Sequence, residues 1–144
     1  MHAENRRKTE KAFWLLIPIF VVLLIIIFNI SLGVVQDRSL RRTTESIIYN
    51  VLTTNVSDMR ARIITLYEEE GFETEALIFY YNENTVYISN THFYNMFLGT
   101  ISFSEGGISF NNTGRAEVSL RGMYQNGEVI IEVVDPEEIP MLQD

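Results

Sequence analysis

The 23 residues from Phe13 to Val35, FWLLIPIFVVLLIIIFNISLGVV, carry no charged side chain. A helix rises about 1.5 Å per residue, so this segment would be roughly 34 Å long, enough to cross a hydrocarbon layer about 30 Å thick. A cleaved signal sequence has a shorter apolar core followed by a small-residue cleavage site, and a core helix is rarely apolar on every face. The segment is therefore predicted to span a membrane.

Several residues characterise this predicted anchor. Pro18 lies one turn inside the apolar run and is expected to kink or loosen the helix. Gly33 is small enough to let a second helix approach closely. The predicted membrane-anchor residues are Phe13, Trp14, Pro18, Phe28 and Gly33.

Charge differs between the two sides of the anchor. Residues 1–12 carry four basic and two acidic side chains, whereas residues 36–144 carry seven basic and seventeen acidic ones. Cations just before an anchor favour a cytoplasmic N-terminus, so the chain is expected in the cell membrane, single-pass, with its C-terminal part extracytoplasmic. An acidic domain disfavours nucleic acid as a partner. The absence of cysteine excludes disulfides and zinc–thiolate sites.

Four segments follow from these features. Residues 1–12 form a basic cytoplasmic tail or leader, and residues 13–35 form the transmembrane helix. Residues 36–135 have the size of one extracytoplasmic domain. Residues 136–144 are acidic and contain two prolines, which predicts a flexible tail.

The segment from Val34 to Glu70 contains no glycine or proline, and its apolar residues recur every three or four positions. This spacing predicts one long helix that continues from the anchor and ends at Gly71. Its apolar stripe needs a partner, and some of its residues are candidates for an interface with another subunit. These are Leu40, Ile47, Val51 and Ile63.

Beyond Gly71 the pattern changes to short β-rich runs. They occupy residues 76–81, 85–89, 97–103, 108–110, 115–124 and 128–134. Turn residues separate the first two and the last two runs, so we expect an antiparallel meander of five or six strands, with residues 90–94 as a polar loop. Packing the helical stripe on this sheet buries both apolar faces, which predicts an α+β fold with a long N-terminal helix packed on an antiparallel β-meander.

No group of residues points to catalysis, a cofactor or a metal. His2 and His92 are the only histidines, and they are expected on opposite sides of the membrane, so a catalytic triad or a His-rich metal site is not predicted. The acidic cluster between Glu68 and Glu75 could hold a hard cation or face a basic partner, although a solvated helix end is the simpler interpretation. The chain is therefore not expected to be an enzyme.

A short basic leader, an apolar helix that continues into an amphipathic one, and an antiparallel sheet resemble the type IV pilin-like family, which includes minor pilins and pseudopilins. The segment GTISFSEGGISFNNTGRAEVSLRG also resembles the glycine-punctuated strands of some minor members. The resemblance implies cleavage of a leader between Ala12 and Phe13. At the fifth position after this junction the family usually has a glutamate, and this chain has Ile17. TadE-like pilus proteins share the layout without the same leader and are the second resemblance.

Two functions remain open. The first is a non-enzymatic, single-pass subunit of a pilus-like or secretion filament, which would contact membrane lipid and other membrane or filament subunits in a homo- or hetero-oligomer. The second is an extracytoplasmic sensor or accessory domain that binds a ligand or a partner membrane protein. The filament function predicts a filled core, whereas the sensor function predicts a pocket lined by the aromatic residues between Phe79 and Phe97.

Overall fold

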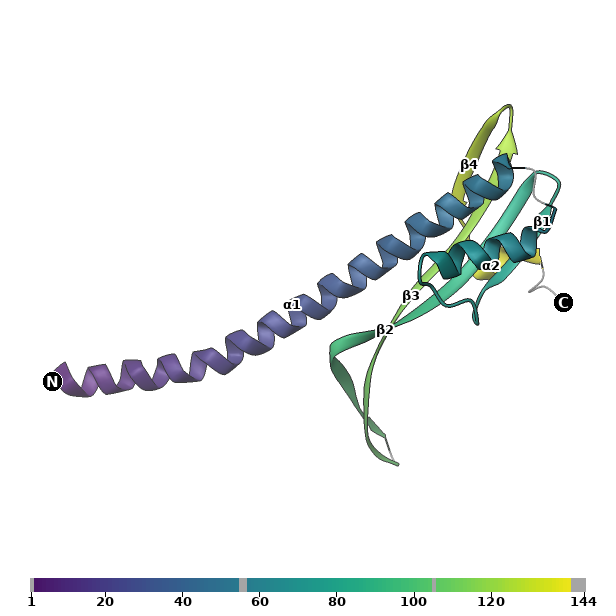
Figure 1. Cartoon of the computed structure of the whole chain (residues 1–144). Helices are drawn as coiled ribbons and strands as arrows, with labels where there is room; N and C mark the ends of the chain where they lie inside the picture. Colours follow the sequence, from purple (N-terminus) through teal and green to yellow (C-terminus); the bar gives the residue numbers. More distant parts are fainter. Residues whose placement is uncertain (1, 55–56, 105, 141–144) are drawn as a thin grey trace. The chain divides into compact units, whose positions relative to one another are not determined.

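The structure, a computed structural model, describes residues 2–54, 57–104 and 106–140, and for residues 2–13, 15, 98 and 100–104 it describes the backbone only. Two helices precede a single antiparallel sheet in which the strands follow chain order (Figure 1). This is the predicted α+β class. The elements are α1 (His2–Thr53), α2 (Met59–Glu69), β1 (Ile78–Asn82), β2 (Thr85–Ser104), β3 (Gly107–Gln125), β4 (Glu128–Val133) and the short 3₁₀ helix η1 (Pro136–Glu138).

The chain divides into two compact units. Residues 33–94 and 113–144 form one, which we call the domain. Residues 1–32 form the other together with residues 95–112, the end of the hairpin made by β2 and β3, which we call the outer hairpin. The helix–sheet packing that defines the fold lies within the domain.

The core of the domain lies between its helices and one face of the sheet. Alternate residues of β3, from Gly114 to Gly122, are buried, while the residues between them are exposed or half-buried. These buried residues of β3 pack against the apolar residues of α1 and α2. Buried members of this core are Leu40, Ile47, Ile48, Val51, Ile63, Tyr67, Phe72, Val86, Ile88, Ala116, Val118 and Leu120.

The residues expected to contact another subunit belong to this core. Leu40 and Ile63 are completely buried, and Ile47 and Val51 are nearly so. Their side chains fill the interface between the helices and sheet of one chain, so they are not available to a second subunit. The prediction of a helical stripe is confirmed, but its partner is the chain's own sheet.

Helix and sheet approach each other closely at Gly122 in β3. A Cβ atom at this position would lie 2.0 Å from Cγ2 of Ile48 and 3.1 Å from Cδ1 of Leu52, both on α1. These are shorter than van der Waals distances, so only glycine allows α1 to approach β3 this closely.

One polar pair lies inside the core. Oγ1 of Thr44 donates to the carbonyl oxygen of Leu40 at 2.8 Å and lies 2.6 Å from the hydroxyl oxygen of Tyr67. Because a threonine hydroxyl has a single proton, the hydroxyl of Tyr67 donates to Oγ1 of Thr44. Burial raises the pKa of Tyr67 well above its ordinary value, and the hydrogen bond with Thr44 partly opposes this rise.

The prediction of one unbroken helix up to Glu70 is wrong, because α1 ends at Thr53 and α2 begins at Met59. Asp58 explains the new start. Its backbone is extended, and its side chain accepts a hydrogen bond from the backbone N–H of Ala61 at 3.0 Å, which is the geometry of an N-cap. The periodicity of apolar residues continues across the break and therefore concealed it.

The predicted end of the helix at Gly71 is confirmed. Gly71 has a φ of 79°, its N–H donates to the carbonyl of Glu68 at 3.0 Å, and the N–H of Phe72 donates to the carbonyl of Tyr67 at 2.9 Å. This pair of hydrogen bonds is the Schellman motif, which ends a helix by satisfying its last carbonyl groups.

The sheet has four strands in place of the five or six that we expected, because β2 and β3 each combine two predicted runs. Residues 90–94, predicted to be a polar loop, lie within β2. Asn90 is almost completely buried there, and its Nδ2 donates to the carbonyl of Glu73 at 3.1 Å. A satisfied amide can occupy a buried strand position that its polarity alone would exclude.

The turns follow the sequence signals. Asn82 pairs with Thr85 at the end of the β1–β2 hairpin, and Asn126 and Gly127 connect β3 to β4 with φ values of 53° and 85°. Two positive φ values in a two-residue turn are typical of type I′ hairpins. The predicted flexible tail includes η1 and the buried Ile139, while residues 141–144 lie outside the described part of the chain.

Candidate functional site

The apolar part of α1 is the most distinctive surface of the chain. Over the described residues, one helix near the N-terminus is long and apolar enough to cross a membrane, and none of its apolar window is buried. Trp14 is 72% exposed and Phe28 is 56% exposed. A soluble core helix can pass the same test of length and composition, but it would be mostly buried.

The other predicted anchor residues are placed as follows. The helix α1 continues through Pro18. Ala12 and Phe13 lie in helical backbone, and their side chains are outside the description. A Cβ atom at Gly33 would lie 2.9 Å from the hydroxyl oxygen of Tyr94, so the small size of Gly33 accommodates a side chain of its own domain.

The outer hairpin contacts α1 within their shared unit. The backbone N–H of Phe97 in β2 donates to Oδ1 of Asn29 at 3.0 Å. The ring of Phe97 also meets that of Phe28 edge to face, with centroids 6.0 Å apart and an interplanar angle of 77°. Neighbouring residues of α1 therefore hold one strand of the hairpin through a polar and an aromatic contact.

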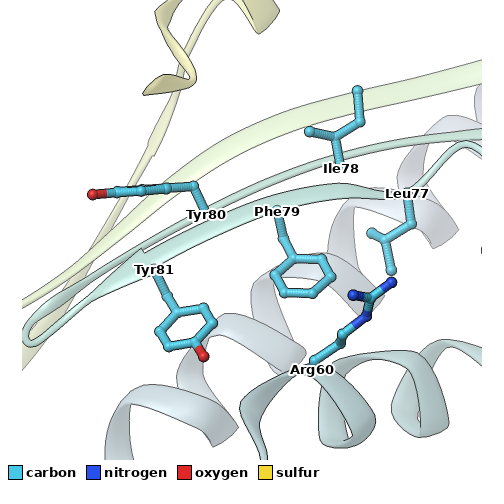
Figure 2. Close-up of a pocket in the computed structure, with 6 residues that line it drawn as sticks. All are labelled: Arg60, Leu77, Ile78, Phe79, Tyr80 and Tyr81. Atoms are coloured by element: carbon cyan, nitrogen blue, oxygen red, sulfur yellow. The ribbon is translucent and has the colours of Figure 1, made fainter. Parts of the chain in front are cut away.

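A groove of about 430 Å³ lies between α2 and the edge strand β1 (Figure 2). Leu77, Phe79 and Tyr81 point to the side of the strand where Arg60 of α2 lies, and Ile78 points away. The rings of Phe79 and Tyr81 are stacked, with centroids 6.5 Å apart. The groove combines an aromatic wall with one cation, which suits an apolar group that carries a negative charge.

This groove partly matches the predicted aromatic pocket. Phe79, Tyr80 and Tyr81 line it, but the aromatic residues from Tyr87 to Phe97 do not. The sequence analysis did not identify Arg60 as a groove residue, because a basic residue between the apolar positions of a helix is expected to face solvent.

The opposite face of the sheet carries a second aromatic group. Tyr80 of β1 and Tyr87 of β2 are register partners, with ring centroids 6.2 Å apart. The guanidinium of Arg121 lies 6.0 Å from the Tyr87 ring and pairs with Glu132 across β3 and β4. Hydrogen bonding to Glu132 raises the pKa of Arg121, which keeps it cationic. Tyr80, Tyr87 and Arg121 are half-buried on this face.

The residues with potential for chemistry are scattered. His92 lies in β2, its ring meets Phe72 edge to face at 4.9 Å, and its Nδ1 is buried without a hydrogen-bond partner among the described residues. The acidic residues at the end of α2 are exposed, and no group of three or more His, Asp or Glu side chains in the described ranges could hold a metal ion. Among the side chains that the structure describes, no nucleophile, base and orienting group lie together.

Comparisons of the chain with protein-family models, with curated proteins and with solved structures give no match.

Proposed function

We propose that the chain is a single-pass membrane protein that acts as a structural subunit of a larger assembly. The observation that carries this proposal is the exposed apolar surface of α1, from Trp14 to Val35. Burying one large apolar side chain is worth about 1.5–3 kcal/mol, so an uncovered surface of this extent is strongly disfavoured in water. Lipid or the helices of other subunits are the environments that cover it.

The orientation belongs to the same proposal. Lys and Arg residues within positions 1–12 face a cytoplasm, and the domain lies on the other side of the membrane. Arg41 on the domain side is paired with Glu45 at 2.9 Å, which reduces the weight of the cations that follow the anchor. The full set of basic residues before the anchor is Arg6, Arg7, Lys8 and Lys11.

The surfaces left for other subunits follow from what the domain buries. The apolar stripe of its helices is buried against its own sheet. The surfaces that remain for lateral contacts with other subunits are the apolar part of α1 and the outer face of the sheet. A helix that serves as anchor and lateral contact, followed by a sheet domain, is the layout of a pilus-like or secretion filament subunit. This finer proposal draws its support from the resemblance of the layout to pilin-like proteins.

Membrane extraction tests the anchor. The full-length chain is expected to remain with membranes in alkaline carbonate and to enter solution with detergent. Replacing Leu23 and Ile27 with arginine costs about 2.5–3.5 kcal/mol each at the centre of a span, so that variant is expected to lose stable insertion. The matched control places arginine at the exposed positions Thr65 and Gln125 and should stay in the membrane fraction. Recovery of the unaltered chain in the soluble fraction would contradict the proposal.

Disulfide crosslinking tests the assembly. The chain has no cysteine, so single cysteines introduced along α1 report only their own contacts. In an assembly held by α1, crosslinked dimers or heteromers should recur at every third or fourth position between Ile19 and Ile30. The control is a cysteine at the exposed Glu128. Membranes that give no crosslink at any α1 position would remove the subunit function while leaving the anchor in place.

The second candidate function is an accessory domain that binds a ligand or a partner membrane protein. The groove at β1 favours it, because an edge strand beside an aromatic wall can accept an extended segment. A photoreactive side chain at Tyr81 would then crosslink to a partner, and Arg60→Glu would abolish the crosslink. Crosslinks confined to α1 would favour the subunit function.

A further inference from the structure

The described residues of the outer hairpin take no part in the strand pairing with β1 and β4. The strand β1 pairs with residues 85–89 of β2, and β4 pairs with residues 120–125 of β3. The described residues of the outer hairpin, 95–104 and 106–112, therefore belong to a two-stranded ribbon without a third strand on either side. A two-stranded ribbon buries little of its own apolar surface and is marginal in water.

Three large apolar side chains of this ribbon are uncovered. Phe97 is 69% exposed, Ile108 is 73% exposed and Phe110 is 62% exposed. Ile108 and Phe110 are two positions apart in β3, so they lie on the same face of the strand. Within residues 95–112 the sequence has a single charged residue, Glu105. A surface with little charge and exposed aromatic rings is suited to the lipid interface of a membrane.

The contact with α1 supplies the second argument. Asn29 lies within the uncharged run, two turns before its end, where an amide that lacks a hydrogen-bond partner is costly. The backbone N–H of Phe97 donates to Oδ1 of Asn29, and the Phe97 ring packs on Phe28. Wherever α1 meets lipid at Asn29, this strand of the hairpin is held at the same depth.

We infer that the outer hairpin is a second membrane contact, which inserts Phe97, Ile108 and Phe110 into the interface of the leaflet on the domain side. The inference rests on the proposed function, since it takes the apolar part of α1 to be in lipid. The hydrocarbon centre excludes the hairpin, because a two-stranded ribbon leaves backbone groups on its outer edges unpaired there. The headgroup and carbonyl layer can satisfy those groups and also favours aromatic rings.

Tryptophan quenching tests this inference and the anchor separately. The chain has one tryptophan, Trp14, so the unaltered protein in phosphatidylcholine nanodiscs reports on the anchor. The variant Trp14→Phe/Phe110→Trp reports on the hairpin, and Trp14→Phe/Tyr124→Trp is the matched control at the opposite end of β3. Phosphatidylcholine brominated near the headgroup is the quencher. Trp14→Phe/Ile108→Trp is an independent second reporter of the hairpin.

The expected result is strong quenching of both hairpin reporters and almost none of the Tyr124→Trp control. Quenching of Trp14 by lipid brominated along the acyl chain, with hairpin reporters no more quenched than the control, overturns the inference and leaves the anchor standing. Absence of quenching at Trp14 itself overturns the proposed function. Circular dichroism and unchanged elution of each variant establish that the reporters are in folded protein.

Discussion

The hydroxyl of Tyr67 in α2 donates to Oγ1 of Thr44 in α1 across 2.6 Å, inside a core that is otherwise mostly apolar. The hydroxyl of Thr44 in turn donates a hydrogen bond to the carbonyl oxygen of Leu40. The two helices are thus joined by a directional contact at the point where both are buried. This contact has consequences for stability that can be measured.

Alkaline pH should destabilise the domain through Tyr67. Its folded-state pKa is raised, while in the unfolded chain it loses its proton near its ordinary pKa of about 10. Above that pH the unfolded state binds fewer protons than the folded state, so the free energy of unfolding falls as pH rises, by about 1.4 kcal/mol at pH 11. The contribution is fully present below pH 10.

The variant Tyr67→Phe tests this dependence. At pH 8 it should lose about 1 kcal/mol, because the hydrogen bond to Thr44 is gone. Between pH 9 and pH 11 it should lose less stability than the unaltered chain. Urea denaturation followed by circular dichroism in detergent measures both values. Parallel loss of stability in the two proteins would show that Tyr67 is not the titrating group.

Gly122→Ala should destabilise the domain by about 1–3 kcal/mol through overpacking, since the new methyl group would overlap Cγ2 of the buried Ile48. Ile48→Ala removes that atom and should cost about 2–5 kcal/mol by itself. The double variant should be more stable than the sum of the two losses implies, because Ile48→Ala makes room for the new methyl group, which fills part of the space left. If denaturation experiments showed that the losses of stability in the two single variants simply add, Gly122 and Ile48 would not be in contact.

Asp58→Ala should cost about 1 kcal/mol by removing the N-cap of α2. Asp58→Asn is the matched control, since its amide oxygen can still accept the N–H of Ala61, and it should stay close to the unaltered stability. Thermal unfolding followed at a helical wavelength measures the difference. If both variants lost the same amount of stability, the negative charge of Asp58, and not its hydrogen bond to Ala61, would be the cause.

Asn90→Ala should destabilise the domain by about 0.5–1.5 kcal/mol, because the carbonyl of Glu73 then loses its side-chain donor. Asn90→Asp should cost more at neutral pH than at pH 4, since it places a carboxylate at a buried position and faces it toward that carbonyl. Denaturation at both pH values distinguishes the two variants. If the loss of stability in Asn90→Asp did not depend on pH, a buried carboxylate could not be its cause.

Local signals predicted the parts of the fold that depend on local chemistry. The uncharged run predicted the apolar helix, Gly71 predicted the end of α2, and Asn126-Gly127 predicted the turn between β3 and β4. The break after Thr53 was missed because the spacing of apolar residues continues across it, and only the cap at Asp58 marks the new helix.

Contacts between distant segments could not be predicted in this way. Asn90 lies in a strand because the carbonyl of Glu73 satisfies its side chain, and no local pattern indicates that partner. The contact between Asn29 and Phe97 joins residues 68 positions apart. An aromatic pocket between Phe79 and Phe97 was expected only for the sensor function. The groove at β1 contains the first three of those aromatic residues, together with Arg60 of α2, which lies beside that strand.

The tight approach of α1 to β3 also limits how this sequence can diverge. With no space between Gly122 and Ile48, neither position can accept a different volume while the other stays fixed. Among descendants of a common ancestor, these two sites should therefore change as a pair, whereas exposed sites such as Glu128 drift independently.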